Sequence, residues 1–491
     1  MMFKKFKNLK RTPAVYISII IIAILVTFCN YVHLKKNGFL SIDVAVWTNI
    51  SKAIGQGKII YRDVFDHKGP ILYLFYSIGY LTAGQPGLFI LDLVCNIISI
   101  YMIYLIAKLI VKDKWKILIV ILTCLFFMIR IANENPCTES IALPFTLIAL
   151  YYIIKYLMDG NSFRNKEAVV TSTCFSVVLL LRPNLTILWV LFYVYMLIKQ
   201  IRAKKIKELL KMILFSALGV FVVFLPVIIY FIANNALYDF FKCYILFNLK
   251  YLGGEKKAII DVIMYFVLET NFILVLIAAL YLVIFILRKR INKNEMKLAK
   301  FGILYFVIAF ILVIMPRRAY NHYLISMIPT FIIPLGIILK YVESKKAISC
   351  ITFFTCVVFI IGYINIQIEK KELYKNMNDY LNDLKQICYV TRPEDDVLIL
   401  GNRAYIYLMT DRQYSGKYLF QIPVAYEDEE IADEVIEDIN RSSPKFIVNA
   451  MHFIGSKKAN YYEQQIKNIL FDKYTAKSGY IYVRKDLEEE D

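Results

Sequence analysis

The chain has 491 residues, of which 59% are hydrophobic, 15% aromatic and only 20% charged. Soluble domains average roughly 45–50% apolar and about 25% charged residues, so this composition excludes an ordinary soluble protein and a disordered chain. The apolar residues form long unbroken runs such as Ala14 to Cys29 rather than a heptad stripe, which also excludes a coiled coil. We therefore expect a polytopic α-helical membrane protein.

The formal net charge of +19 would suit a nucleic-acid partner, but the Lys and Arg residues lie in short clusters between the apolar runs. Cytoplasmic loops of membrane proteins carry their positive charge in this way, so we expect no nucleic-acid partner. The nine Cys are scattered without a CxxC pair and do not indicate a disulfide framework.

The basic residues of Met1 to Thr12 precede the first apolar run, and no signal-peptide cleavage site follows it, so we expect an uncleaved first span. About eleven apolar stretches approach the ~20 residues that cross a membrane. They are 14–29, 88–111, 116–132, 138–157, 168–181, 185–199, 212–233, 271–287, 301–315, 323–340 and 347–364. The stretch 71–83 is shorter and lies between Gly-Pro sequences, which favours a helix at the membrane interface.

The basic loops predict the orientation of the spans. With 71–83 left out of the count, the clusters all lie on the same side as the N-terminus. These clusters are 108–116, 164–166, 199–211, 288–300 and 340–346. The positive-inside rule then predicts an integral plasma-membrane protein with a cytoplasmic N-terminus, and eleven spans put the C-terminus outside.

Beyond about Gln367 the chain becomes polar and alternates short β-type runs with helical stretches. The β-type runs are 396–400, 445–448 and 480–483, and the helical stretches are 427–440 and 460–470. We expect residues 1–366 to form the transmembrane domain, with a first outer loop at 34–87, and residues 367–491 to form a small extracytoplasmic α/β domain. No GxGxxG follows Gly401, so we expect this domain to be accessory rather than catalytic.

Ionisable residues collect on the predicted outer side of the membrane, where basic residues run against the trend of the loops. Such groups at membrane depth cost about 2.5–3.5 kcal/mol each on insertion scales, which makes them functional candidates. The candidates are Asp43, Asp63, Asp66, His67 and Lys68 in the first outer loop, and Glu139, Arg182, Arg317, Arg318 and His322 in later loops or helix ends.

A mixed acidic and basic site suits transfer from a phosphate leaving group. Arg or Lys would neutralise the phosphate, and a carboxylate would act as general base for a hydroxyl nucleophile. A lipid-phosphate sugar donor would present its phosphate at this depth, with its polyprenyl tail between helices. The same charges equally permit a transporter with a charged gate.

Three stretches carry a resemblance to a known family. They are Ser41-Ile42-Asp43 with Gly57-Lys58, Tyr61-Arg62-Asp63, Phe65-Asp66-His67-Lys68-Gly69-Pro70 and Tyr73; Thr138-Glu139 to Phe145; and Arg318 through His322-Tyr323 to Pro329. The first resembles the first outer loop of the GT-C-fold glycosyltransferases related to protein O-mannosyltransferases and bacterial lipid A aminoarabinose transferases, and the other two are similar to the same group. The resemblance extends to about Ile364, and the Asp-His-Lys-Gly-Pro loop is its most specific part.

The resemblance implies inverting transfer of a hexose or pentose from a polyprenyl-phosphate donor to a cell-envelope acceptor hydroxyl on the outer membrane face. It implies Asp43 as the base that activates the acceptor and Glu139 as the second acid, and we add Asp66 as a third catalytic candidate. The substrate-binding candidates are Asp63, His67, Lys68, Arg182, Arg317, Arg318 and His322. The acceptor would be a protein, a glycopolymer or a lipid.

Structural roles stay open for several candidates. Asp43 could cap the helix that follows it. Asp63 and Asp66 could hold neighbouring cations in surface ion pairs. Arg317 and Arg318 could be anchors at the headgroup boundary. No cofactor is assigned. The His residues lack HxxxH or HxH spacing, and Asp43 lacks an adjacent carboxylate, so the sequence leaves dependence on a divalent cation as an open alternative.

The alternative function is a multi-spanning transporter or lipid-linked glycan flippase. Such a protein predicts repeated halves and ionisable residues near the bilayer midplane on broken helices. No repeat is evident, and the charges cluster at one surface, which favours the enzyme. A third alternative, a non-catalytic scaffold for polymer assembly, would tolerate loss of Asp43.

Overall fold

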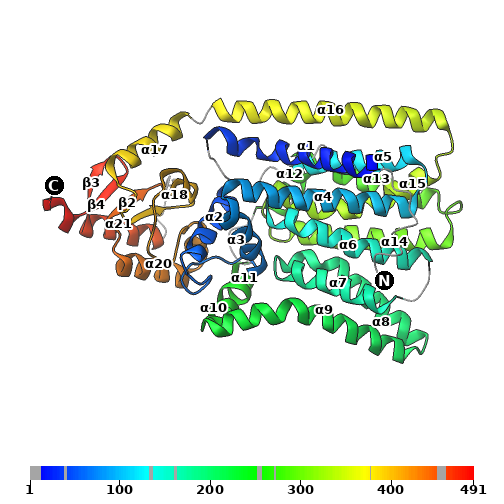
Figure 1. Cartoon of the computed structure of the whole chain (residues 1–491), viewed down its shortest axis with the longest axis horizontal. Coiled ribbons are helices and arrows are strands. Elements are labelled where there is room, and N and C mark those ends of the chain that lie inside the picture. Colours follow the sequence, from blue (N-terminus) through cyan, green and yellow to red (C-terminus); the bar gives the residue numbers. More distant parts are fainter. Residues whose placement is uncertain are drawn as a thin grey trace.

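The structure of the chain is a computed structural model. It describes residues 13–37, 41–131, 136–159, 163–251, 257–269, 273–375, 378–450 and 461–490, so the basic segment before the first span lies outside the described residues. Long helices lie side by side as a bundle, and a small sheet with its helices lies at one end (Figure 1). This arrangement confirms the expected fold class, a helical membrane protein with a small C-terminal α/β region.

Each of the eleven predicted spans corresponds to a helix or to two adjoining helices. They are α1 (Pro13–Asn37), α4 (Gln85–Ile110), α5 (Lys114–Ile131), α6 (Thr138–Asp159), α7 (Asn165–Leu179), η2 (Pro183–Thr186) with α8 (Ile187–Arg202), α9 (Ile206–Ala233), α13 (Ile273–Ile286), α14 (Lys293–Ile314), η4 (Asn321–Met327) with α15 (Ile328–Lys340), and α16 (Lys345–Lys375).

Fewer than eleven of these helices are long and apolar enough to cross a membrane. Among the described residues seven pass by themselves: α4, α6, η2 with α8, α9, α14, η4 with α15, and α16. An eighth span would be α12 (Ile259–Glu269) together with α13, two helices bent by 86°. The others are short or charged: the apolar part of α1 is Pro13–Cys29, α7 has 15 residues, and α5 contains Lys114, Lys116 and Arg130. The expected count of about eleven therefore exceeds the seven or eight that length and composition support.

The basic connections meet at the end of the bundle opposite the sheet. Lys116, after α4, lies with its Nζ 3.4 Å from the carbonyl oxygen of Lys340 at the end of α15. Lys297 of α14 donates a hydrogen bond of 3.1 Å to the carbonyl of Leu157 near the end of α6. These contacts between distant connections agree with the prediction that the basic clusters share one side.

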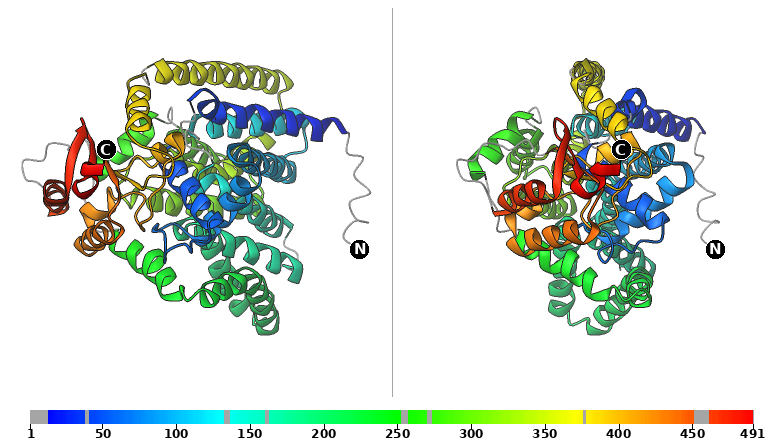
Figure 2. Two further views of the ribbon diagram at one scale, coloured as in Figure 1. Left: turned by 60° about the vertical axis from the view of Figure 1, so that its left-hand side comes forward. Right: turned by 90° about the vertical axis from the view of Figure 1, so that its left-hand side faces the viewer.

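Short helices fill the space between the bundle and the α/β region (Figures 1 and 2). They are α2 (Ile42–Gly55), α3 (Pro70–Ala83), α10 (Leu237–Phe240), the π-helical turn η3 (Phe241–Leu246) and α11 (Phe247–Tyr251). The stretch predicted to be interfacial is α3. It begins at Pro70, whose ring favours the first helical position, and it stops at Gly84, whose φ of +62° suits glycine.

The C-terminal sheet has four strands in the order β1-β2-β4-β3. The strands are β1 (Val397–Leu400), β2 (Phe446–Asn449), β3 (Tyr474–Ser478) and β4 (Ile481–Arg484); β1 and β2 are parallel, and β4 is antiparallel to both β2 and β3. The accompanying helices are α17 (Asn378–Val390), α18 (Tyr405–Thr410), α19 (Val424–Glu427), α20 (Glu429–Ser442), α21 (Tyr461–Lys473) and η5 (Lys485–Glu490). The sequence predicted three strands and missed β3, an edge strand in which only Tyr474 is buried.

The first outer loop docks onto the α/β region. Lys52 of α2 forms an ion pair of 2.8 Å with Asp411, and Asn49 donates a buried hydrogen bond of 2.8 Å to the carbonyl of Ala404. The helix that carries Asp43 is therefore fixed between the bundle and the sheet.

Candidate functional site

Asp43 lies in the first turn of α2 but does not cap it. The cap is Ser41, whose hydroxyl accepts a hydrogen bond of 3.3 Å from the backbone N–H of Val44. The cap interpretation of Asp43 is therefore wrong. Its half-buried carboxylate makes no hydrogen bond or ion pair with the described residues, and the N-terminal position on the helix favours a negative charge.

The run Tyr61 to Pro70 forms a closed loop. The backbone N–H of Tyr61 donates to the carbonyl of Val64 at 2.8 Å, and its buried hydroxyl donates to the carbonyl of Lys68 at 2.5 Å. These two bonds fix the backbone between them, so the side chains from Asp66 to Lys68 start from a defined position.

Gly69 attaches this loop to the turn that carries Arg182. Its N–H donates to the carbonyl of Leu181 at 3.3 Å, and a Cβ at Gly69 would lie 1.9 Å from the carbonyl oxygen of Leu180. Only glycine fits this approach. The contact explains why the Asp-His-Lys-Gly-Pro sequence contains a glycine, and it brings Lys68 close to Arg182.

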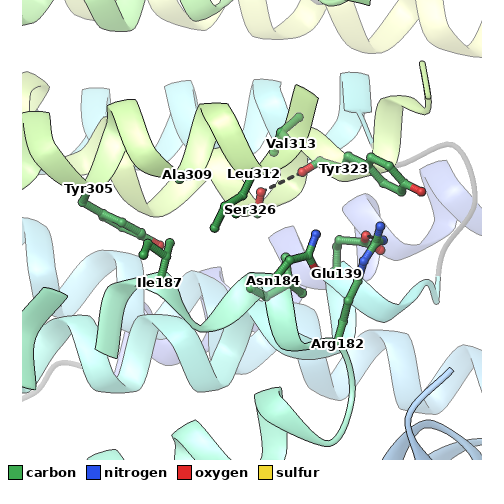
Figure 3. Close-up of a pocket in the computed structure, with 11 residues that line it drawn as sticks. Glu139, Arg182, Asn184, Ile187, Tyr305, Ala309, Leu312, Val313, Tyr323 and Ser326 are labelled. Carbon is green, nitrogen blue, oxygen red and sulfur yellow. Dashed lines mark hydrogen bonds and ion pairs between the residues drawn. The ribbon is translucent and has the colours of Figure 1, made fainter. Parts of the chain in front are cut away.

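Arg182 forms a buried ion pair with Glu139, the acid in the first turn of α6. The guanidinium carbon of Arg182 also lies 4.0 Å from the ring centroid of Tyr323. The ring of His322 stacks on Tyr320 with centroids 5.6 Å apart. The ion pair with Glu139 and the contact with the Tyr323 ring hold the guanidinium in place (Figure 3).

Asp66 and His67 are buried next to each other. The backbone N–H of His67 donates to Asp66 Oδ1 at 2.6 Å, and Lys68 Nζ lies 3.4 Å from His67 Nε2. Burial raises the pKa of the Asp66 carboxyl, against the opposing charge of Lys68. Burial also lowers the pKa of the His67 imidazole well below 6.5, as do the charges of Lys68, Arg182 and Arg318. His67 is therefore neutral at neutral pH.

Most of the candidates lie close enough to act on one another electrostatically. We call this group the polar cluster: Asp43, Asp66, His67, Lys68, Glu139, Arg182, Arg318 and His322. It contains both the carboxylates and the cations that the predicted chemistry requires.

Two candidates have other surroundings. Asp63 forms an ion pair of 2.8 Å with Arg62 and accepts a hydrogen bond of 2.8 Å from the N–H of Ile59. These contacts match the structural role that the sequence left open for it, an ion pair with a neighbouring cation. A surface ion pair does not describe Asp66, because this residue is only 2% exposed. Arg317 has a left-handed φ of +52°, and its side chain makes no hydrogen bond or ion pair with the described residues.

A small cavity of about 20 Å³ adjoins the Arg182–Glu139 pair. Its lining residues are Glu139, Arg182, Asn184, Leu185, Ile187, Tyr305, Ala309, Leu312, Val313, Tyr323 and Ser326. Its polar end lies at the ion pair, and the remainder is mostly apolar and extends between α8, α14 and η4 (Figure 3). Apolar helix residues carry no sequence signal for such a cavity.

Two further neighbours of His67 were missed from the sequence. Asn248 of α11 donates a hydrogen bond of 2.7 Å to the carbonyl of His67, and the ring of Phe247 lies 5.3 Å from the His67 ring. The signal for this contact in the sequence was Asn248 itself, a single Asn within an apolar stretch. Among the described residues, no group of three or more His, Cys, Asp or Glu side chains is arranged to hold a metal ion.

Comparisons with known proteins agree with this architecture. The crystal structure of ArnT from Cupriavidus metallidurans bound to undecaprenyl phosphate is similar, with a TM-score of 0.60 and 12% sequence identity, over 89% of this chain and 93% of that chain. This likeness confirms the GT-C-like fold. No curated protein sequence matches the chain.

A family model matches residues 4–350, which include every member of the polar cluster. The matched part covers more than half of the chain and ends before the α/β region. The chain therefore belongs to the family described as competence-induced protein Ccs4 N-terminal domain.

Proposed function

We propose that this protein is an inverting glycosyltransferase that moves a sugar from a polyprenyl-phosphate donor to a hydroxyl of a cell-envelope acceptor. The observation that carries the proposal is the position of Arg182, which belongs to the polar cluster and also lines the polar end of an apolar cavity between helices. A lipid phosphate needs both surroundings, cations for its head and apolar side chains for its tail.

The donor phosphate would bind Arg182 together with the neighbouring cations Lys68 and Arg318. The planar guanidinium presents two parallel N–H donors to phosphate oxygens, and Glu139 orients it. The first isoprene units of the tail would lie against the apolar side chains past Leu185 and would have to widen the small cavity there. Binding of undecaprenyl phosphate to an ArnT of the same fold supports this assignment.

The acceptor hydroxyl would lose its proton to Asp43, whose carboxylate has no hydrogen-bond partner among the described residues. The hydroxyl oxygen forms a bond to the anomeric carbon while the bond from that carbon to the phosphate oxygen breaks, with inversion at the carbon. The electron pair leaves with the phosphate, where Arg182 stabilises the charge. Asp66, which accepts the His67 N–H, fixes the loop that carries Lys68.

We also propose that the chain lies in the plasma membrane with its N-terminus in the cytoplasm and its α/β region outside. The basic connections at the end opposite the α/β region support this orientation. A division near residue 367 remains our proposal for the two domains, although α16 continues as a helix to Lys375.

The test is a transfer assay with the full chain in lipid nanodiscs, a radiolabelled undecaprenyl-phosphate hexose or pentose, and a cell-envelope fraction as acceptor. We expect label in the acceptor and release of undecaprenyl phosphate by the wild type, and loss of both in Asp43→Asn. Reactions with and without a chelator decide the metal dependence. Passage of intact donor across a proteoliposome membrane, without transfer, would instead support the flippase alternative.

A further inference from the structure

The α/β region contacts Phe65, the residue before Asp66 of the polar cluster, through residues 414–420, which we call the clamp loop. The backbone N–H of Phe65 donates a hydrogen bond of 2.9 Å to the carbonyl of Lys417. The buried Phe65 ring packs against Tyr418, with centroids 4.9 Å apart. Because Phe65 directly precedes Asp66, a shift of the clamp loop moves the backbone of the polar cluster.

A buried carboxylate, Asp438 of α20, holds the clamp loop. Its Oδ2 accepts hydrogen bonds from the backbone N–H groups of Lys417 at 2.7 Å and Tyr418 at 3.3 Å, and from the hydroxyl of Tyr414 at 3.0 Å. Gly416 permits this approach, since a Cβ there would lie 2.5 Å from Oδ2. The carboxylate thus fixes the clamp loop at Lys417, whose carbonyl accepts the hydrogen bond from Phe65.

A second contact leads from the same helix to His67. Glu434 of α20 accepts a hydrogen bond from the hydroxyl of Tyr418 and forms an ion pair with Lys242 of η3. η3 continues into α11, where Asn248 donates to the carbonyl of His67 at 2.7 Å. α20 therefore reaches this backbone from two sides, through the clamp loop and through η3.

We propose that α20 is a positioning element of the transfer site and that Asp438 and Glu434 are its positioning residues. Neither is a catalytic residue, because both act through other segments. The effect on sugar transfer rests on the proposed function, whereas the effect on the Phe65–Lys68 backbone does not. A misplacement of about 1 Å costs as much as 10²-fold in rate in a site built on positioning, so loosening this backbone lowers turnover.

The first experiment compares hydrogen exchange in the full chain in nanodiscs for the wild type, Asp438→Asn, Glu434→Gln and the control Glu437→Gln. Each variant removes one negative charge from α20, but Glu437 is exposed and makes no hydrogen bond with the described residues. Asp438→Asn strands no buried cation, because its ion-pair partner Arg441 is 76% exposed.

We expect amides of Phe65 to Gly69 to exchange roughly ten- to hundredfold faster in Asp438→Asn, which follows from loss of hydrogen bonds to a charged acceptor. Glu434→Gln should give a smaller increase, and Glu437→Gln should match the wild type. Unchanged protection of Phe65 to Gly69 in Asp438→Asn would overturn the proposal. If Asp438→Asn does not fold, the same comparison with Glu434→Gln decides.

The second experiment separates positioning from a general loss of structure. In Asp438→Asn we expect kcat to fall at least about tenfold while the Kd for undecaprenyl phosphate stays within about threefold, because Asp438 does not line the cavity beside Arg182. A purely structural defect would lower binding capacity and turnover together, and that result would contradict positioning. Failure of the wild type to transfer sugar would overturn only the proposed function, since hydrogen exchange needs no substrate.

Discussion

The carboxylate of Glu139 and the guanidinium of Arg182 form an ion pair whose side chains are only 2% and 15% exposed. Breaking such a pair on one side leaves a buried charge without its partner, which typically costs about 3–5 kcal/mol. The two residues come from α6 and from the turn before η2, and Gly69 packs against that turn. The proposed phosphate site is therefore also a structural junction, so its variants must be judged by binding and stability together.

Arg182→Lys is the first test of phosphate recognition. Lysine keeps the charge opposite Glu139 but loses the planar fork and the stacking on Tyr323, so affinity for undecaprenyl phosphate should fall at least about tenfold. Binding is measured in nanodiscs, with the exposed Arg202→Lys as a matched control. Unchanged binding in the Lys variants of Arg182, Arg317 and Arg318 would support headgroup anchors instead.

Gly69→Ala tests the attachment of the Asp66–Pro70 loop to the turn before Arg182. The new Cβ would lie 1.9 Å from a backbone oxygen, which cannot move aside, so we expect destabilisation of about 1–3 kcal/mol and loss of transfer. Gly55→Ala is the control, since its Cβ would meet only the flexible end of Leu81. Equal melting temperatures for the two variants would show that the approach at Gly69 does not constrain the loop.

Much of the fold was predictable because it depends on local patterns. Long apolar runs bounded by charge produced each expected helix, and the buried strands at 396–400 and 445–448 have the β-type composition that identified them. Strand β3 was not predictable, because an exposed edge strand such as Tyr474–Ser478 lacks that composition. The bend between α12 and α13 likewise had no local signal.

The candidate site was predictable only as a collection of residue types on one side of the membrane. Topology brought most of the candidates to one end, but it could not pair Arg182 with Glu139, because a contact across 43 residues depends on how helices pack. The hydrogen bond from Phe65 to Lys417 crosses from the first outer loop to the α/β region and has no periodic pattern. Asp63 illustrates the converse, since this carboxylate in the same loop makes local contacts, with its neighbour Arg62 and with the N–H of Ile59.

His67 predicts a pH-dependent stability. Its pKa in the folded protein lies well below its unfolded value of 6.5, because burial and three cations oppose protonation. Between these two pKa values only the unfolded chain binds the proton, so acid favours unfolding. The stability that the neutral imidazole contributes is therefore complete above pH 6.5, and it is lost as the pH falls below 6.5, by up to about 1.4 kcal/mol per pH unit.

We therefore expect His67→Gln to be less sensitive than the wild type to a shift from about pH 7.5 to about pH 5.5. Melting temperatures in detergent measure the difference, and Asp66 is present in both proteins, so its opposite titration largely cancels. The same pH dependence in both proteins would contradict a buried neutral imidazole.

Reporter fusions test the orientation. Because the basic connections meet at the end opposite the α/β region, a phosphatase fused to the C-terminus should be active outside the cell. A phosphatase fused within Arg202 to Lys207 should lie in the cytoplasm and therefore be inactive. A cytoplasmic C-terminus would place the polar cluster on the wrong side for an extracytoplasmic acceptor.

Asp43→Asn is the test of the general base. The amide has nearly the shape of the carboxylate, and the helix cap belongs to Ser41, so expression, stability and undecaprenyl-phosphate binding should change little. An amide cannot accept the acceptor's proton, and such a proton transfer typically contributes about 10²–10⁴ in rate. We therefore expect turnover to fall at least about a hundredfold in single-turnover measurements with saturating donor.

The control for this variant is Glu208→Gln, which removes one exposed carboxylate near the opposite end of the bundle and should transfer sugar at the wild-type rate. Asp43 makes no hydrogen bond or ion pair with the described residues, so the loss in Asp43→Asn would not come from a broken contact with any of them. Activity within a few-fold of the wild type would exclude Asp43 as the base. Glu139 already neutralises Arg182, so Asp66 would then be the carboxylate to test next.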